Sequence, residues 1–225
     1  LRLGEFERNS LVVFAITMIA NVLSYLYQIV MGNMLTPADY GTVNTLLSLS
    51  VVVGVPSGII SALTATYTAK YHAHGETFAI AAFMHGMLRV AAVLAAIVFV
   101  AGALLSRPIA HVLQIDDPHY VTVVMVLVAS NCLGPVFSST LQGVKRFIPY
   151  SMNSVLSFAF RLLLGVFFVW LGWGIPGALA ALILAACLTM LYCLFKSRDL
   201  FFAPVKENLA LDRTEIRRYF VSTFW

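Results

Sequence analysis

The stretch that decides the fold is residues 11–41, which read LVVFAITMIANVLSYLYQIVM and then GNMLTPADYG. Leu11–Met31 carries no charge and has about the 20 residues that one crossing of a lipid bilayer requires. After it, Thr36 is a suitable N-cap, Pro37 suits the first position of a helix, and Asp39 suits its positively polarised first turn. The stretch therefore predicts one transmembrane helix, a short turn and the start of a second helix.

The composition of the whole chain agrees with a membrane protein. Of its 225 residues, 60% are hydrophobic and 11% are charged, whereas soluble domains carry about 25% charged residues. The formal net charge is +4, but the basic residues lie between apolar runs and do not form the clustered surface that nucleic acid requires. We therefore expect an integral membrane protein and no nucleic-acid partner.

Five more apolar runs follow the first one. They are Tyr40–Ala69, Phe78–Leu105, Tyr120–Leu141, Pro149–Trp170 and Ile175–Phe195. Pro56 lies inside the second run and has no backbone donor, so we expect a helix kink there, and broken membrane helices often line cavities. The predicted fold is an all-α polytopic membrane protein with six transmembrane helices.

The lysine and arginine residues predict the orientation. Of the 14, only Arg107 lies on one predicted side, Arg89 and Arg161 lie inside spans, and the remaining eleven share the other side. These eleven are Arg2, Arg8, Lys70, Lys145, Arg146, Lys196, Arg198, Lys206, Arg213, Arg217 and Arg218. Short cytoplasmic connections hold the excess of positive charge, so we expect the amino terminus in the cytoplasm.

The end of the chain suggests a continuation. Residues 1–196 are expected to form the six-helix lobe, 197–218 a cytoplasmic linker with an amphipathic lead-in, and 219–225 the truncated start of a seventh helix and a second lobe. Six helices return the chain to the side on which it began. Two such lobes would therefore be parallel repeats about an axis normal to the membrane.

Arg89 and Arg161 are the strongest candidates for a binding site. Each lies near the middle of its predicted span, where an arginine costs about 2.5–3.5 kcal/mol on the insertion scale. The six spans contain no Asp or Glu, so the partners must be carbonyls, polar side chains, a second lobe or an anionic ligand. The guanidinium fork suits phosphate. The alternative is that the arginines only hold helices together.

Other polar residues in the spans are weaker candidates. His85 precedes Arg89 by one helical turn and is either a hydrogen-bonding or titrating site residue or a packed interfacial one. Several amides could line a sugar path or serve as hydrogen bonds between helices. They are Asn21, Gln28, Asn33, Asn44, Asn131 and Asn153. The sequence shows no catalytic motif, metal-ligand set or cofactor motif, and we predict none of the three.

Three motifs carry a resemblance to a known family. Gly32–Gly41 resembles the signature after the first helix in the polysaccharide-transporter branch of the multidrug/oligosaccharidyl-lipid/polysaccharide exporter superfamily, commonly Leu-Gly-Pro-Glu-Asp-Tyr-Gly there. Leu141–Phe147 resembles the junction between helices four and five of that family, and Gly172–Ala178 adds a further likeness. The resemblance covers nearly the whole chain. It implies the amino-terminal lobe of a two-lobe transporter whose second lobe is missing from this chain.

The resemblance also implies a function in polysaccharide biosynthesis, including lipopolysaccharide. A flippase of this branch moves a polyprenyl pyrophosphate sugar across the cytoplasmic (inner) membrane by alternating access, with membrane lipids around it. One alternative is a cation-coupled multidrug exporter of the same superfamily, which usually needs a membrane acid that these spans lack. The others are a membrane-embedded enzyme or a non-transport membrane subunit of glycan assembly.

Overall fold

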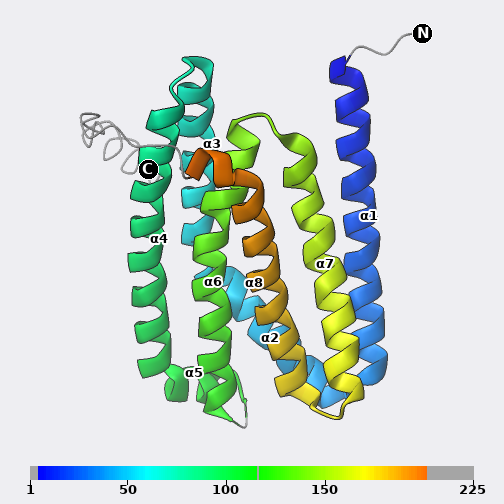
Figure 1. Ribbon diagram of the computed structural model, residues 1–225. Helices are drawn as coiled ribbons and strands as arrows, with labels where there is room; N and C mark the ends of the chain where they lie inside the picture. The colour runs from blue at the N-terminus through cyan, green and yellow to red at the C-terminus, as the bar shows by residue number, and fades with distance from the viewer. Residues whose placement is uncertain (1–4, 116, 202–225) are drawn as a thin grey trace.

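The computed structural model describes residues 5–115 and 117–201, which fold into α-helices joined by short connections (Figure 1). The helices are α1 Glu5–Met34, α2 Pro37–Val53, α3 Val55–Ala73, α4 Thr77–Leu104, α5 Ser106–Val112, α6 Pro118–Gly143, α7 Phe147–Trp170 and α8 Gly174–Phe201. Within these residues, five helices are long and apolar enough to cross a membrane. The bent pair of α2 and α3 makes a sixth if it counts as one span. The predicted all-α, multi-pass fold is confirmed.

The second predicted span is broken into α2 and α3, which meet at 49°. Thr36 caps α2, because its Oγ1 accepts a hydrogen bond from the Asp39 amide at 3.2 Å. The break lies at Gly54, where an added Cβ would stand 2.8 Å from the Ser50 carbonyl oxygen. Pro56 lies in the first turn of α3, where a missing backbone donor costs no helical hydrogen bond.

α6 is the centre of the bundle and packs against α3, α4 and α8. α7 packs between α1 and α8, so that α1 is attached to the bundle mainly through α7 (Figure 1). The starts of α1, α4 and α7 and the end of α8 lie at one end of the bundle. The short helix α5 lies at the other end (Figure 1).

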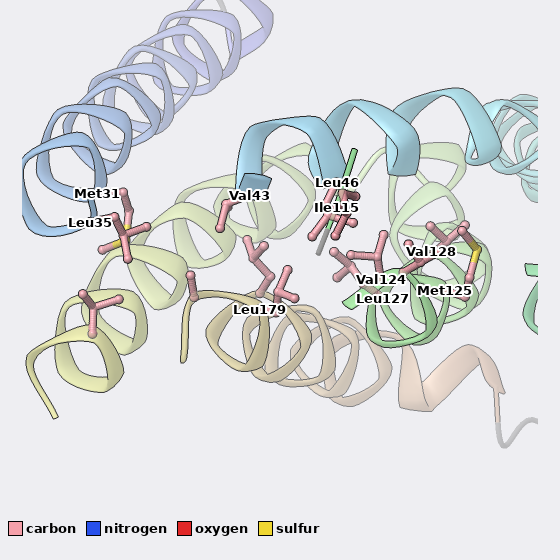
Figure 2. Close-up of a cluster of buried hydrophobic side chains, with 14 of the residues drawn as sticks. Met31, Leu35, Val43, Leu46, Ile115, Val124, Met125, Leu127, Val128 and Leu179 are labelled. Atoms are coloured by element: carbon pink, nitrogen blue, oxygen red, sulfur yellow. The ribbon is translucent and has the colours of Figure 1, made fainter. Parts of the chain in front are cut away.

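The largest buried cluster fills the end of the bundle near α5. It joins Met31 of α1 and Leu35, which directly follows α1, to Leu46 of α2, Val124 of α6 and Leu179 of α8 (Figure 2). α5 was not expected from the sequence, because it lies between the predicted spans Phe78–Leu105 and Tyr120–Leu141. Asp117 caps α6 through a hydrogen bond from the His119 amide to its Oδ1 at 2.9 Å.

Small residues let α3 and α6 approach each other closely. An added Cβ on Gly143 would stand 2.7 Å from the Thr68 Cβ and 2.8 Å from the Ala65 carbonyl oxygen. The hydroxyls of Ser61 and Ser139 hydrogen-bond across the same pair of helices at 2.7 Å. This is the usual packing of membrane helices, in which small residues and hydroxyls replace the hydrophobic driving force that lipid removes.

An ion pair ties the connection between α6 and α7 to the end of α8. Arg146 Nη1 donates to the Lys196 carbonyl and to Asp199 Oδ1, both at 3.1 Å, and Nη2 pairs with Asp199 Oδ2. α8 continues to Phe201, past the expected end of the lobe at residue 196. Most of the expected linker at 197–218, and the expected seventh helix at 219–225, lie outside the described residues.

Candidate functional site

A cavity of about 620 Å³ lies between α2, α3, α6, α7 and α8. Its polar lining consists mainly of small hydroxyl and amide side chains together with one arginine. These residues are Ser50, Ser57, Ser130, Asn131, Ser138, Asn153, Ser157, Arg161 and Thr189. Apolar residues such as Leu47, Leu127 and Leu182 complete the walls. Among the described residues, none from α1, α4 or α5 lines this cavity.

Two interruptions of helix geometry border the cavity. The first is the α2–α3 break at Gly54, and the second is Pro135 inside α6. Proline has no N–H, so Pro135 leaves the carbonyl of Asn131, four residues earlier, without its helical donor. Backbone groups freed at membrane depth are tolerated where they line a polar cavity. Sequence reasoning singled out the first interruption and missed Pro135, although a proline within an apolar run was a visible signal.

The hydroxyl groups of the lining present oxygen atoms to the cavity. Ser50 donates to the Leu47 carbonyl at 2.7 Å, and Ser130 donates to the Val126 carbonyl at 2.9 Å. Ser138 and Thr189 also donate to carbonyls of their own helices, and Ser57 donates to the Gly54 carbonyl at the α2–α3 break. A hydroxyl has a single donor and two acceptor lone pairs. With the donors engaged, this wall offers mainly hydrogen-bond acceptors.

Arg161 is the cationic residue of the lining. It is half-buried on α7, and its guanidinium carbon lies 5.5 Å from the centroid of the Phe158 ring. Its Nε is buried without a hydrogen-bond partner, and the described residues provide no carboxylate among the cavity walls. Tyr27 of α1 interacts electrostatically with Arg161, and its hydroxyl is also buried without a hydrogen-bond partner among the described residues. Arg161 is therefore a buried donor with no anion to bind within this part of the chain.

A polar stripe runs along α7 toward Arg161. Asn153, Ser157 and Arg161 are spaced four residues apart and all line the cavity, as expected for one face of a helix. The Oδ1 atom of Asn153 is buried and has no hydrogen-bond partner among the described residues. This spacing was a signal in the sequence that we did not use, because we considered Asn153 and Arg161 separately.

The remaining sequence candidates lie outside the cavity. Arg89 is exposed on α4, and Asn21 and Gln28 are exposed on α1. His85 is half-buried; its Nδ1 is 2.8 Å from the Ala81 carbonyl oxygen, and its ring stacks on that of Phe201 at 4.4 Å. The structure therefore brings Arg161 together with Asn131 and Asn153, and it does not bring Arg89 or His85 to the same site.

Asn33 and Asn44 also lie outside the cavity lining. Asn33 Nδ2 donates to the Ile29 carbonyl at 2.8 Å within α1, so its amide is engaged by its own helix. No group of three or more His, Cys, Asp or Glu residues that could hold a metal ion occurs in the described part of the chain.

The described residues form a bundle of helices, most of them long and apolar enough to span a membrane, around a polar cavity, and solved structures share this fold. A transporter of the multidrug/oligosaccharidyl-lipid/polysaccharide (MOP) superfamily from Pyrococcus furiosus, described as having a binding pocket of reverse polarity, aligns with a TM-score of 0.71 at 15% identity. The alignment covers 96% of this chain and 51% of that one. An outward-facing multidrug resistance MATE transporter of the same superfamily aligns at 0.70 and 17% identity, with the same coverage of both chains.

The family itself is shown by the sequence. The model of the family described as "Polysaccharide biosynthesis protein" matches residues 6–225, and the chain belongs to this family, within the MOP superfamily. It corresponds to the amino-terminal half and spans about half the length of the solved transporters. No curated protein matches the chain. The resemblance inferred from the sequence motifs is confirmed.

Proposed function

We propose that this chain is the amino-terminal lobe of a flippase that moves a lipid-linked oligosaccharide across the cytoplasmic membrane by alternating access. The observation that carries the proposal is the lining of the cavity, which combines an unpaired arginine with uncharged polar groups and no acid among its described residues. Membership of the polysaccharide biosynthesis family supports it. A cationic, hydrogen-bonding cavity suits an anionic sugar carrier.

In this proposal Arg161 binds the pyrophosphate of a polyprenyl pyrophosphate sugar. A guanidinium offers five N–H donors in a fork that matches phosphate oxygens, and the surrounding protein strengthens the attraction relative to water. The serine and asparagine side chains bind the sugar, while the polyprenyl tail stays in the membrane. No step requires covalent chemistry, so we assign the chain no catalytic residue.

The positive charge of the connections supports an orientation with the amino terminus in the cytoplasm. α7 then starts at the cytoplasmic end. Arg161 follows its first residue, Phe147, by 14 positions, which is about 21 Å along the helix axis. The head group would thus enter from the cytoplasm and reach Arg161 near the middle of the membrane.

A multidrug exporter is the second candidate, and the fold favours it because one solved relative is described as a multidrug resistance transporter. Export of cationic drugs requires a site that attracts positive charge. In the described cavity, Arg161 repels a cation and no carboxylate is present to offset it. The electrostatics of this lobe therefore favour an anionic substrate.

The test is glycan production in a host that lacks its own flippase. The full-length protein should restore surface glycan, and Arg161→Gln at equal membrane abundance should lower export while lipid-linked precursor accumulates on the cytoplasmic face. Arg89→Gln is the matched control, because Arg89 lies outside the cavity, and it should support normal export. Failure of the unaltered protein to restore glycan, together with resistance to cationic drugs, would favour the exporter.

A further inference from the structure

We propose that Asn153 is a specificity residue. It accepts a hydrogen bond from the sugar that adjoins the anionic group of the substrate. This inference rests on the proposed function and extends it, because it assigns a second contact to the same cavity. The ligand it selects has two different ends. One end accepts hydrogen bonds at Arg161, and the other donates a hydrogen bond to Asn153 Oδ1.

The first argument is the unmet hydrogen bond of Asn153. Asn153 lines the cavity, and its Oδ1 is buried and has no hydrogen-bond partner among the described residues. A buried polar atom without a partner is costly, and native proteins rarely keep one without a function. A ligand that donates a hydrogen bond to this atom regains that free energy, whereas a ligand without a donor does not.

The second argument concerns which part of the ligand can reach this atom. Asn153 and Arg161 are eight residues apart on α7, or about 12 Å along the axis. An ionised phosphate has acceptors and no donor, and a guanidinium has donors and no acceptor. Phosphate therefore satisfies Arg161 but not Asn153, and a group with donors has to lie at the Asn153 level. Sugar hydroxyls and N-acetyl amides are such groups.

The third argument is independent of Asn153 and comes from the opposite walls. Ser50, Ser130 and Ser138 direct their donors into their own helices, so they too face the cavity as acceptors. A ligand rich in donors matches this wall. A sugar carries many hydroxyl donors, whereas a bare polyprenyl pyrophosphate carries none when ionised.

The test compares two lipids with purified full-length protein in nanodiscs. One is polyprenyl pyrophosphate without sugar, and the other is the same lipid carrying one N-acetylhexosamine. The unaltered protein should bind the sugar-bearing lipid more tightly. Asn153→Ala should weaken the binding of that lipid by about 3- to 10-fold, the contribution of one hydrogen bond. It should leave the affinity for the sugar-free lipid unchanged. Asn153→Ser, which keeps an acceptor, should recover part of the loss.

Asn33→Ala is the matched control, because the Asn33 amide is engaged by Ile29 outside the cavity; it should bind both lipids normally. If Asn153→Ala weakens the binding of both lipids equally, or of neither, the proposed role of Asn153 is overturned. Failure of the proposed function has a different signature, in which the unaltered protein binds neither lipid. A third lipid carrying one hexose separates hydroxyl recognition from amide recognition.

Discussion

Arg161 and Arg89 occupy similar depths in the lobe but opposite environments. Both lie in helices that start at the same end of the bundle (Figure 1), 14 residues from the start of α7 and 12 residues from the start of α4. Arg161 faces a polar cavity, while Arg89 is exposed on the outside among Val90, Val93 and Ile97. Depth alone therefore does not identify a binding site. The face of the helix on which the arginine lies determines whether it lines the cavity.

The first prediction tests which of the two faces meets water. In a background with Cys132, Cys187 and Cys193 replaced by alanine, Ser157→Cys should react with a water-soluble maleimide about 100-fold faster than Val93→Cys. A thiol in apolar surroundings stays protonated and unreactive. The labelling rates are measured in membranes open on both sides. Equal rates would remove the distinction between the inner and outer faces.

A carboxylate introduced on each face gives the second prediction. Ser157→Asp places an acid one helical turn before Arg161, where it competes with an anionic ligand, and transport of a lipid-linked sugar in proteoliposomes should fall by about 10- to 100-fold. Val93→Asp places the same acid one turn after Arg89, outside the cavity, and transport should stay within about twofold. A larger loss from Val93→Asp would show that the outer face takes part in transport.

The third prediction concerns the close packing behind the cavity wall. Gly143→Ala pushes a Cβ to 2.7 Å from Thr68 Cβ and 2.8 Å from a backbone oxygen, so it should destabilise the protein by about 1–3 kcal/mol. Gly58→Ala has nothing within 4 Å of the added Cβ and should not destabilise it. The unfolding of both variants is compared in mixed micelles. A stable Gly143→Ala variant would contradict the observed approach of α3 and α6.

Arg146 provides the smallest expected effect, because this third arginine already has a carboxylate partner in an exposed setting. The side chains of Arg146 and Asp199 are 42% and 50% exposed, and such pairs contribute at most about 1 kcal/mol. Asp199→Asn should lower stability by less than that, and 1 M salt should remove most of the difference. A loss above this range would show that the pair has a structural role beyond a surface contact.

The predictability of the fold and of the site differs for physical reasons. The length of each apolar run and the Thr36-Pro37 start of α2 are local properties, so they were readable without tertiary contacts. Which face of each membrane helix points into the bundle was not readable from the sequence. Lipid and the protein interior are both apolar, so the apolar residues on all sides of α4 do not distinguish the two. Arg89 therefore looked equivalent to Arg161 until packing separated them.

Within the site, the residues missed in the sequence were those with weak individual signals. A single serine in a membrane helix is as often a packing residue as a lining one, and only the fold brings Ser50, Ser130 and Ser138 to one cavity. Pro135 was a stronger signal, since proline frees a backbone carbonyl wherever it occurs inside a helix. The Arg146–Asp199 pair joins residues 53 positions apart, which no local pattern could indicate.

The central claim is that the inward-facing arginine, and not the outward-facing one, binds the anionic head group. Its most direct test is the affinity of polyprenyl pyrophosphate for the purified full-length protein and for its Arg161→Gln and Arg89→Gln variants. We predict that Arg161→Gln weakens binding by about 10- to 100-fold, the value of a charge-assisted contact, and that Arg89→Gln changes it less than twofold. Equal losses in the two variants, or a larger loss in Arg89→Gln, would contradict the account.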